Sequence, residues 1–463
     1  MKPKTTRLFT LVSLLLLASF LVSCAAPAAQ PAAPAAPAAQ EPAAQAPSEP
    51  AAKEFSGELT FWSGYSEFKP FYDTVVADFQ AKYPKVKVNV LIAASLRDHE
   101  QKLASAIPTD TGPDVYEGSL YVNAKFVDAN LMPALPQWVV DRTQGYWDQW
   151  ITDYFTLNGT RYVVPFFEGR AAIFYNKDCF KEAGLPEPAS DKPMEWEAFI
   201  DAAKKMTKYD ASGKVTRSGF GLRRSGQGSG VGEKWWIFGY PRGQDTWTVD
   251  ANGKYMVNIN SEGAQKNLQT YMDMLYNWKT DSIDLPQDAQ AFQAGVSCMF
   301  QRETWVIGDM AKKAPDINYG TMPMPKDARW GTLRNPMGFW VTKSAKDPDL
   351  AYEFALFMVQ PQYQQLLLDT VGWLPSRQDV DFSAILEKKP AFKAFLVNDP
   401  EYKFYRYPPI GVFDEIQTKY SERLVNAYLD PSLANDPAAI KALLDEANAE
   451  GNAILKREKL GGE

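Results

Sequence analysis

Few side chains in this chain could perform chemistry, and their number excludes several kinds of site. The chain contains one histidine, His99, and three cysteines. A histidine-rich metal site is therefore excluded, and so is any Ser/His or Cys/His catalytic arrangement that does not use His99. Carboxylate chemistry stays open. The distinctive feature is the aromatic content, with 13 Trp, 22 Tyr and 26 Phe.

The first 55 residues have the order of a lipoprotein leader followed by a tether. Three basic residues precede an apolar stretch over 8–22, which is the order of a secretory signal peptide rather than of a membrane span. Residues 21–24, "LVSC", resemble a bacterial lipobox, so we expect residues 1–23 to be removed and Cys24 to be lipidated. An ordinary signal peptide with an incidental cysteine is the alternative. Residues 24–55 are rich in Ala and Pro, which favours an extended, solvated tether.

The rest of the chain, about 400 residues, is long enough for two lobes with a core each. "GELTFW" (57–62) alternates like a strand, Phe71, Val75 and Phe79 share one helix face, and "KVKVNVLI" (85–92) alternates again. Strand, helix and strand in this order predict a βαβ unit, a parallel sheet and an α/β fold. The net charge of −7 comes without a basic stripe, which argues against a nucleic-acid partner.

Three residues outside these elements have their own expected environments. His99 lies in "LRDHEQKLASAI", where the pattern predicts a solvated position on a helix. Cys179 and Cys298 could form a disulfide in an oxidising compartment, but two buried free thiols are the favoured state.

From residue 57 to the C-terminus, the order of motifs resembles the extracellular solute-binding proteins of bacterial ABC sugar importers, the family of maltose-binding protein. The motifs are "TGPDV" (111–115), "YVVPFFEGRAAIFYNKD" (162–178), "GLPEPASDKPMEWEAF" (184–199), "AFQAGVSCMFQRETW" (291–305), "YGTMPMP" (319–325), "NPMGFWVTKSAKDPDLAYEFALFM" (335–358) and "VGWLPSR" (371–377). Two features depart from the family pattern. Glu195 replaces the usual Thr or Ser before Trp196, which weakens the helix N-cap. Bulky residues at 337–340 replace frequent glycines, which bears on the identity of the ligand.

The resemblance implies a two-lobed α/β periplasmic-binding-protein fold, type II-like, whose discontinuous lobes are joined by a hinge of crossing segments. The crossings would lie near Pro165, Asp281–Asp288 and Asn318. Lobe 1 would comprise 57–165 and 285–318, and lobe 2 would comprise 166–284 and 319–463. Ligand would bind in the cleft between the lobes, which would close by hinge rotation. On this map Cys179 and Cys298 lie in different lobes, which further disfavours a disulfide.

The resemblance also implies a ligand site of aromatic platforms with polar groups at their edges. Its candidate members are Trp62, Ser63, Tyr65, Tyr116, Glu117, Trp235, Trp236, Arg302, Glu303, Trp305, Gly338, Phe339, Trp340 and Trp373. Because aromatic residues are abundant, core packing is the alternative for each ring, and an ordinary surface position is the alternative for each carboxylate. Arg170, Arg223 and Arg224 are expected to be solvated or structural, and several of them in the cleft would indicate an acidic sugar.

The resulting expectation is a lipid-anchored extracytoplasmic receptor, without catalytic activity, that captures a carbohydrate, favoured to be an oligosaccharide. It would deliver this ligand to the transmembrane subunits of an ABC permease, as a monomer held at the membrane by the lipid on Cys24. No cofactor, metal or nucleic acid is expected. One alternative is the same fold with a phosphorylated or acidic solute, such as a glycerophosphodiester. The other is a secreted glycoside hydrolase that uses Glu117 and Glu303 as its carboxylate pair.

Overall fold

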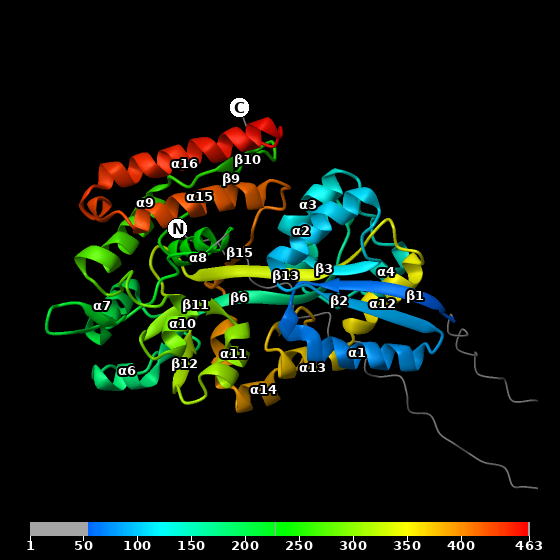
Figure 1. Cartoon of the computed structure of the whole chain (residues 1–463), viewed down its shortest axis with the longest axis horizontal. Coiled ribbons are helices and arrows are strands. Elements are labelled where there is room, and N and C mark those ends of the chain that lie inside the picture. The colour runs from blue at the N-terminus through cyan, green and yellow to red at the C-terminus, as the bar shows by residue number, and fades with distance from the viewer. Residues whose placement is uncertain (1–53, 227, 462–463) are drawn as a thin grey trace, which may run out of the picture. The chain divides into compact units, whose positions relative to one another are not determined.

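The computed structural model describes residues 54–226 and 228–461. The predicted signal peptide (1–23), Cys24 and the tether up to residue 53 lie outside the described residues. Within these residues the main sheet has nine strands, with the path β11-β6-β13-β3-β1-β2, and β12, β14 and β15 pair beside it (Figure 1). Its strands are β1 (Gly57–Ser63), β2 (Val86–Ile92), β3 (Val115–Ser119), β6 (Val164–Asn176), β11 (Met299–Glu303), β12 (Tyr319–Met322), β13 (Gly331–Val341), β14 (Leu374–Pro375) and β15 (Lys403–Tyr405).

Short hairpins and many helices complete the described fold. The hairpin strands are β4 (Thr156–Leu157), β5 (Thr160–Arg161), β7 (Lys208–Tyr209), β8 (Val215–Arg217), β9 (Trp247–Val249) and β10 (Tyr255–Val257). The helices are α1 (Lys69–Lys82), α2 (Leu96–Ala106), α3 (Leu120–Asp128), α4 (Gln137–Arg142), α5 (Gln149–Tyr154), α6 (Lys177–Glu182), α7 (Trp196–Met206), α8 (Gly230–Gly239), α9 (Glu262–Met272), α10 (Asp288–Gln293), α11 (Trp305–Lys313), α12 (Pro348–Met358), α13 (Pro361–Thr370), α14 (Ser383–Lys388), α15 (Phe413–Tyr428) and α16 (Pro437–Arg457). In the part of the chain that the structure describes, none of these helices has the length and apolar character to cross a membrane.

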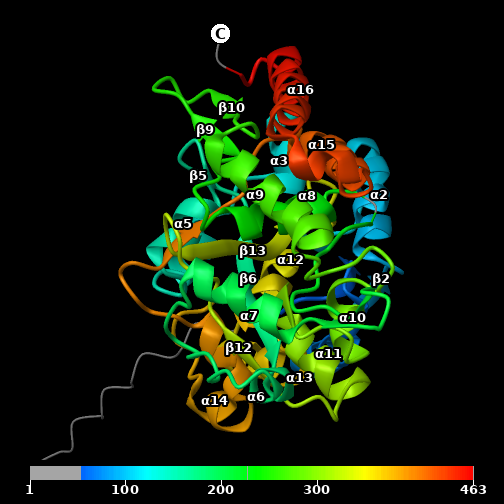
Figure 2. The same cartoon turned by 90° about the vertical axis from the view of Figure 1, so that its left-hand side faces the viewer.

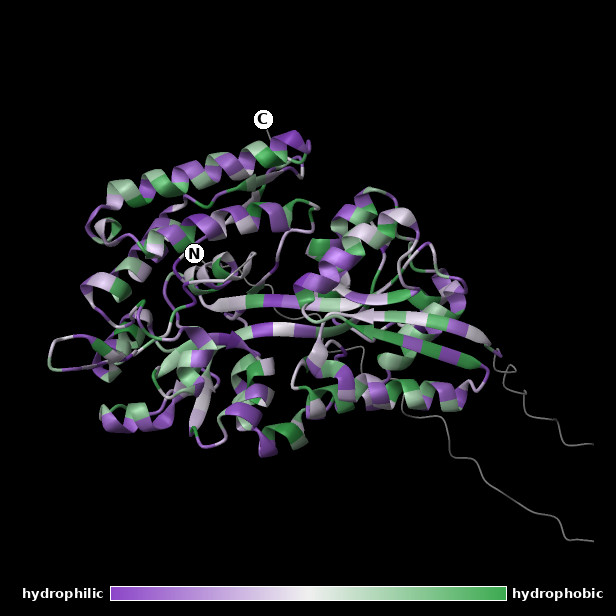
Figure 3. Cartoon of the chain, viewed as in Figure 1, coloured by the Kyte–Doolittle hydropathy of each residue, from purple (hydrophilic) through white to green (hydrophobic). Residues whose placement is uncertain are grey.

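Local sequence signals explain several of these elements. The predicted βαβ unit is confirmed, since β1 pairs in parallel with β2 along its whole length and α1 lies between them in sequence. Helix α12 begins where Asp347 accepts a hydrogen bond from the Leu350 N–H at 3.1 Å, with Pro348 in the first turn. Helix α7 begins at Trp196, and its N-cap residue Glu195 makes no side-chain cap hydrogen bond, as the weak N-cap residue predicts. Helices α15 and α16 lie side by side in both views (Figures 1 and 2), and the alternating colours of α16 in Figure 3 mark an amphipathic helix.

Two long strands connect the hydrophobic cores. The first half of β6, through Phe167, belongs to a first core with β1, β3, α1 and α12. In its second half, Ala171, Ile173 and Tyr175 face a second core, whereas Ala172 and Phe174 face a third. This alternation is the two-residue period of a strand that has a core on each face. Strand β13 also spans two cores, because Leu333 lies in the second core and Met337 to Val341 lie in the first.

The packing differs from the predicted division into lobes. The first core contains residues from 55 to 167 and from 337 to 373, whereas the buried apolar residues of 285–318 pack in the second and third cores. Of this segment, partly buried Trp305 packs against the first core as well. The reason for the difference is strand pairing: β11 and β12 both lie antiparallel to the second half of β6. The chain therefore crosses between the cores at β6, at β13 and after Trp373, rather than near Asp281–Asp288 and Asn318. We use "first lobe" and "second lobe" below for these two packing units, and the third core belongs to the second lobe.

Two further expectations are corrected by the packing. Cys179 and Cys298 form a disulfide, so the prediction of free thiols was wrong. The Asn176 N–H donates to the Cys298 carbonyl at 2.8 Å, and this brings the start of α6 against the segment before β11, within one lobe. His99 is buried rather than solvated, because α2 packs closely on the turn after β1. Its Nε2 lies 2.9 Å from the Glu117 carbonyl oxygen, and burial lowers the pKa of the imidazole.

Candidate functional site

A cavity of about 510 Å³ lies between the first and second lobes, beside the middle of the two long strands. Tyr65, Met337 and Trp373 reach it from the first core, whereas Lys234 on α8 and Glu303 at the end of β11 reach it from the second lobe. Clefts between lobes are frequent sites of small-molecule binding. The cavity is therefore the candidate ligand site.

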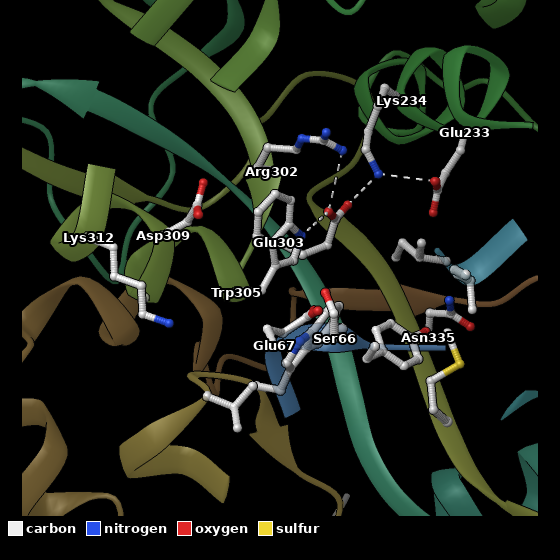
Figure 4. A pocket seen from close by; sticks show the side chains of 18 of the residues that line it. Ser66, Glu67, Glu233, Lys234, Arg302, Glu303, Trp305, Asp309, Lys312 and Asn335 are labelled. Atoms are coloured by element: carbon white, nitrogen blue, oxygen red, sulfur yellow. Dashed lines mark hydrogen bonds and ion pairs between the residues drawn. The ribbon is translucent and has the colours of Figure 1, made fainter. Parts of the chain in front are cut away.

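The wall from the second lobe is charged, and most of its charges are paired within the protein (Figure 4). The Glu303 carboxylate lies 2.5 Å from Lys234 Nζ and 3.8 Å from the nearest Arg302 nitrogen. It also accepts a hydrogen bond from Trp305 Nε1 at 3.4 Å. Lys234 Nζ lies 3.1 Å from Glu233 as well, so it bridges two carboxylates. Charged groups placed in this way can orient polar ligand groups without adding net charge.

Burial and neighbouring charge act in opposite directions on Glu303. Burial alone would raise the pKa of this carboxyl, but Lys234 and then Arg302 outweigh it and hold the pKa well below the ordinary value. Arg302 is in turn held by Asp288, at 2.9 Å, and the Tyr407 hydroxyl donates to Glu233 at 2.6 Å. Glu303 is therefore an anion and a hydrogen-bond acceptor at neutral pH.

The wall from the first lobe is aromatic. The ring of Tyr65 stacks on Phe68 at 5.3 Å between centroids and meets Trp373 edge-on at 6.0 Å. A glycine on β6 makes room for this tryptophan, since a Cβ atom at Gly169 would lie 3.1 Å from the Trp373 ring. Ring faces and edges of this kind provide apolar contact area for a ligand.

Strand β13 contributes three residues to the cavity. Leu333, Asn335 and Met337 alternate along the strand and therefore share one face. Arg334, between them, pairs with Glu168 at 2.5 Å and with Asp148 at 2.8 Å. This ion network belongs to the strand crossing between the lobes.

Five of the predicted site residues line the cavity, and the others lie elsewhere. The lining members are Tyr65, Arg302, Glu303, Trp305 and Trp373. The members outside the lining are Trp62, Ser63, Tyr116, Glu117, Trp235, Trp236, Gly338, Phe339 and Trp340. All of these except Trp62 are buried, and Trp62 is partly buried against the first core. Ligand contact by the lining members stays a prediction.

Packing explains why the predicted aromatic platforms of β3 and β13 lie in the core. Trp340 stacks on Tyr116 with an angle of 8° between the rings, and its Nε1 donates to the Gly118 carbonyl at 3.0 Å. Phe339 stacks on Phe166 at 4.4 Å. At Gly338 a Cβ atom would lie 2.2 Å from Val163, so the strand admits only glycine there. The bulky side chains of Phe339 and Trp340 therefore fill the first core rather than the cleft.

On helix α8, too, the predicted platforms lie in the core, and their neighbours line the cavity. Trp235 packs near Tyr420, and Trp236 packs against Tyr405 at 4.9 Å, so both predicted platforms belong to the second core. The two residues before them, Glu233 and Lys234, line the cavity instead. The sequence signal that could have indicated these two lining residues is the pair of charges inside the otherwise apolar helix "GVGEKWWIFG".

The other lining residues that the sequence did not single out come from several elements. They are Ser66, Glu67, Leu96, Tyr121, Gly169, Gly308, Asp309, Lys312, Lys313, Leu333, Asn335, Met337 and Val371. They are scattered over strands, helices and loops far apart in the chain, so no local sequence pattern groups them. The arginines expected to be structural do have protein partners: Arg170 pairs with Glu168 at 2.6 Å and Arg224 with Asp281 at 3.1 Å.

Residues 74–394 match the model of a family described as bacterial extracellular solute-binding proteins. The arabinooligosaccharide-binding protein of Bacillus subtilis is 25% identical over 370 residues, which cover 75% of this chain and 80% of that protein. An ABC substrate-binding protein from Listeria monocytogenes, solved in complex with cycloalternan, superposes with a TM-score of 0.73 at 19% identity, covering 87% of this chain and all of the other. UgpB from Mycobacterium tuberculosis, in complex with glycerophosphocholine, has a TM-score of 0.71 at 18% identity, with the same coverage. These likenesses confirm the predicted two-lobed α/β fold.

Proposed function

Since the chain belongs to the bacterial extracellular solute-binding proteins, as its motifs predicted, we propose that it captures a neutral carbohydrate for an ABC importer. The ligand would be an oligosaccharide held in the cleft between Trp373 and Glu303. It would contact both lobes and so stabilise their closed arrangement, without a catalytic step.

The observation that supports this proposal is the charge pairing of the cleft. The described lining contains four acidic and four basic side chains, and Lys234, Arg302 and Lys313 each have a carboxylate partner. Sugar hydroxyls can donate to and accept from such paired groups, whereas a phosphate needs cations that are not already neutralised. The aromatic wall adds the apolar surface on which sugar rings stack.

The route to the membrane is part of the same proposal. Cys24 would carry the lipid, residues 24–55 would hold the binding domain away from the bilayer, and the ligand would pass to the permease. Cells labelled with radioactive palmitate should incorporate label into the wild-type chain and not into Cys24→Ser. Equal labelling of the two chains would remove the anchor from the proposal.

A second candidate, a phosphorylated solute, is favoured by two observations. The fold is similar to a structure that holds glycerophosphocholine. Lys312 is also a lining cation for which the described residues provide no ion pair, and it is exposed (Figure 4). A phosphate bound here would depend on this one lysine, so Lys312→Ala should abolish binding of a phosphate ester and leave sugar binding unchanged.

A thermal-melt screen of the full chain separates the two candidates. The compounds are maltotriose, arabinotriose, mannotriose, glycerophosphocholine and sn-glycerol 3-phosphate, with chromatography to detect any product. A ligand at about one hundred times its Kd should stabilise the protein by about 2.7 kcal/mol. Stabilisation by a trisaccharide, without product, supports the neutral sugar. Stabilisation by the phosphate compounds alone would overturn it in favour of the second candidate, and hydrolysis of the trisaccharide would overturn the non-catalytic role.

A further inference from the structure

Beneath the aromatic wall, two residues that the sequence suggested as ligand contacts form a buried hydrogen-bond chain. Glu117, in the middle of β3, is fully buried and accepts from the Ser63 hydroxyl at 2.5 Å. It also accepts from the Gly64 N–H at 3.0 Å and from the Tyr72 hydroxyl on α1. A buried carboxylate needs such donors, because each unsatisfied buried polar group costs free energy. Three donors from β1, the following turn and α1 therefore converge on one carboxylate.

The chain continues from Ser63 to the cleft. The Ser63 oxygen accepts a hydrogen bond from the Tyr65 N–H at 3.1 Å, so one hydroxyl connects the Glu117 carboxylate to the backbone of a lining residue. The turn packs closely on α2, since a Cβ atom at Gly64 would lie 3.0 Å from His99. The Tyr65 ring then packs on Phe68 and on Trp373 at the cleft.

We propose that Glu117 is a positioning residue of the cleft: through Ser63 it holds the turn that presents Tyr65 to the ligand. The proposal rests on the proposed function for the ligand itself, but the geometry of the turn is independent of any ligand. Glu117 does not contact the ligand in this arrangement, because its side chain lies below the wall and outside the lining of the cavity.

The same two neighbouring strands provide a matched control away from the cleft. Thr60 on β1 donates its hydroxyl to Asp114 before β3 at 2.7 Å, and its oxygen accepts from the Asp114 N–H at 2.9 Å. This pair also joins a hydroxyl to a carboxylate across 54 residues of sequence, but neither residue lines the cleft. Thr60→Val should therefore lower stability without moving Tyr65.

The test compares Ser63→Ala, Ser63→Thr and Thr60→Val in the full chain. Calorimetric titration with maltotriose, arabinotriose and mannotriose measures binding. Hydrogen exchange of the peptide that spans residues 63–68, in the unliganded protein, measures how readily the turn opens. We expect Ser63→Ala to weaken trisaccharide binding about tenfold and to speed exchange of the Gly64 and Tyr65 amides about tenfold, as expected for the loss of one hydrogen bond. Ser63→Thr, which keeps the hydroxyl, should restore both values.

Two results would overturn the proposal. The first is that the Gly64 and Tyr65 amides of Ser63→Ala exchange hydrogen at the wild-type rate. The second is that Thr60→Val changes this exchange rate or the binding affinity as much as Ser63→Ala does, which would indicate general destabilisation. If none of the three trisaccharides binds the wild type, the sugar assignment fails, and the exchange comparison still decides whether Ser63 and Glu117 hold the turn.

Discussion

The two walls of the cleft place charge in opposite ways. In the second lobe, the carboxylate of Glu303 lies at the cavity, and its charge is balanced there by Lys234 and Arg302. In the first lobe, the Glu117 carboxylate lies beneath an aromatic wall, where hydroxyl and N–H groups satisfy it without a cation. The pKa of each group follows from this difference. Neighbouring cations lower the pKa of Glu303, and burial raises that of Glu117 to about 7.

The difference suggests separate tasks for the two walls. An ion pair at the cavity can exchange hydrogen bonds with a polar ligand, whereas a carboxylate under the wall can act only through the residues it holds. Four changes would break or sharpen this comparison, and they are taken from the largest expected effect to the smallest.

Lys234→Ala should have the largest effect, because it leaves two carboxylates, Glu233 and Glu303, without their shared cation. Removing one partner of a buried ion pair costs about 3–5 kcal/mol of unfolding free energy. Urea denaturation measures this loss. Lys312→Ala is the control, since this lysine lines the same cavity but is exposed, and its effect should be below about 0.5 kcal/mol. Similar losses in the two variants would show that the charged wall does not depend on its internal pairing.

Removal of the disulfide should distinguish the lobes. The bond joins Cys179 to Cys298 across 119 residues of sequence, within the second lobe. The double variant Cys179→Ala/Cys298→Ala should lose about 2–4 kcal/mol of unfolding free energy, because the disulfide closes a loop that restricts the unfolded chain. Hydrogen exchange should then increase in peptides of α6 and β11 and stay unchanged in β1 and α1. An equal increase in both sets of peptides would contradict a stabilisation that is confined to one lobe.

Glu117→Gln should change the pH dependence of stability. A carboxyl whose pKa is raised in the folded state, here to about 7 from an ordinary 4.5, destabilises the fold as the pH rises through that window. As the pH rises from 5 to 8, the free energy of unfolding of the wild type should therefore fall by up to about 3 kcal/mol more than that of the variant. Denaturation midpoints at both pH values measure the difference. Parallel curves for the two proteins would mean that Glu117 does not titrate in this range.

Gly169→Ala should have the smallest effect on stability and a clear effect on binding. The new methyl group would press on the Trp373 ring, and small overpacking of this kind costs about 1–2 kcal/mol. Because the ring must shift at the cleft, affinity for the bound trisaccharide should fall about tenfold, as measured by calorimetry. Gly112→Ala is the control, since the nearest contact there is 3.5 Å, and it should leave affinity unchanged. Unchanged affinity in Gly169→Ala would show that Trp373 is not a platform.

Periodic elements of this fold could be predicted from the sequence. The shared helix face of Phe71, Val75 and Phe79 predicted the helix that the structure has at α1, and the apolar alternation over 57–62 predicted β1. Such patterns are local, because a helix or strand repeats its buried positions at a fixed interval. The candidate site was less predictable. An aromatic residue such as Trp235 or Trp340 can serve equally as a ligand platform or as a core residue. Only its neighbours in space decide between the two.

The amino-acid sequence by itself determined the α/β class and the family, since motif order and residue type are properties of the chain. The tertiary structure alone decided three other features: the disulfide, the crossing of the chain at β13, and the pairing of Lys234 with Glu303 across 69 residues of sequence. Each depends on which distant segments of the chain become neighbours in space. That choice follows from the packing of whole strands against several cores at once, and no local pattern in the chain records it.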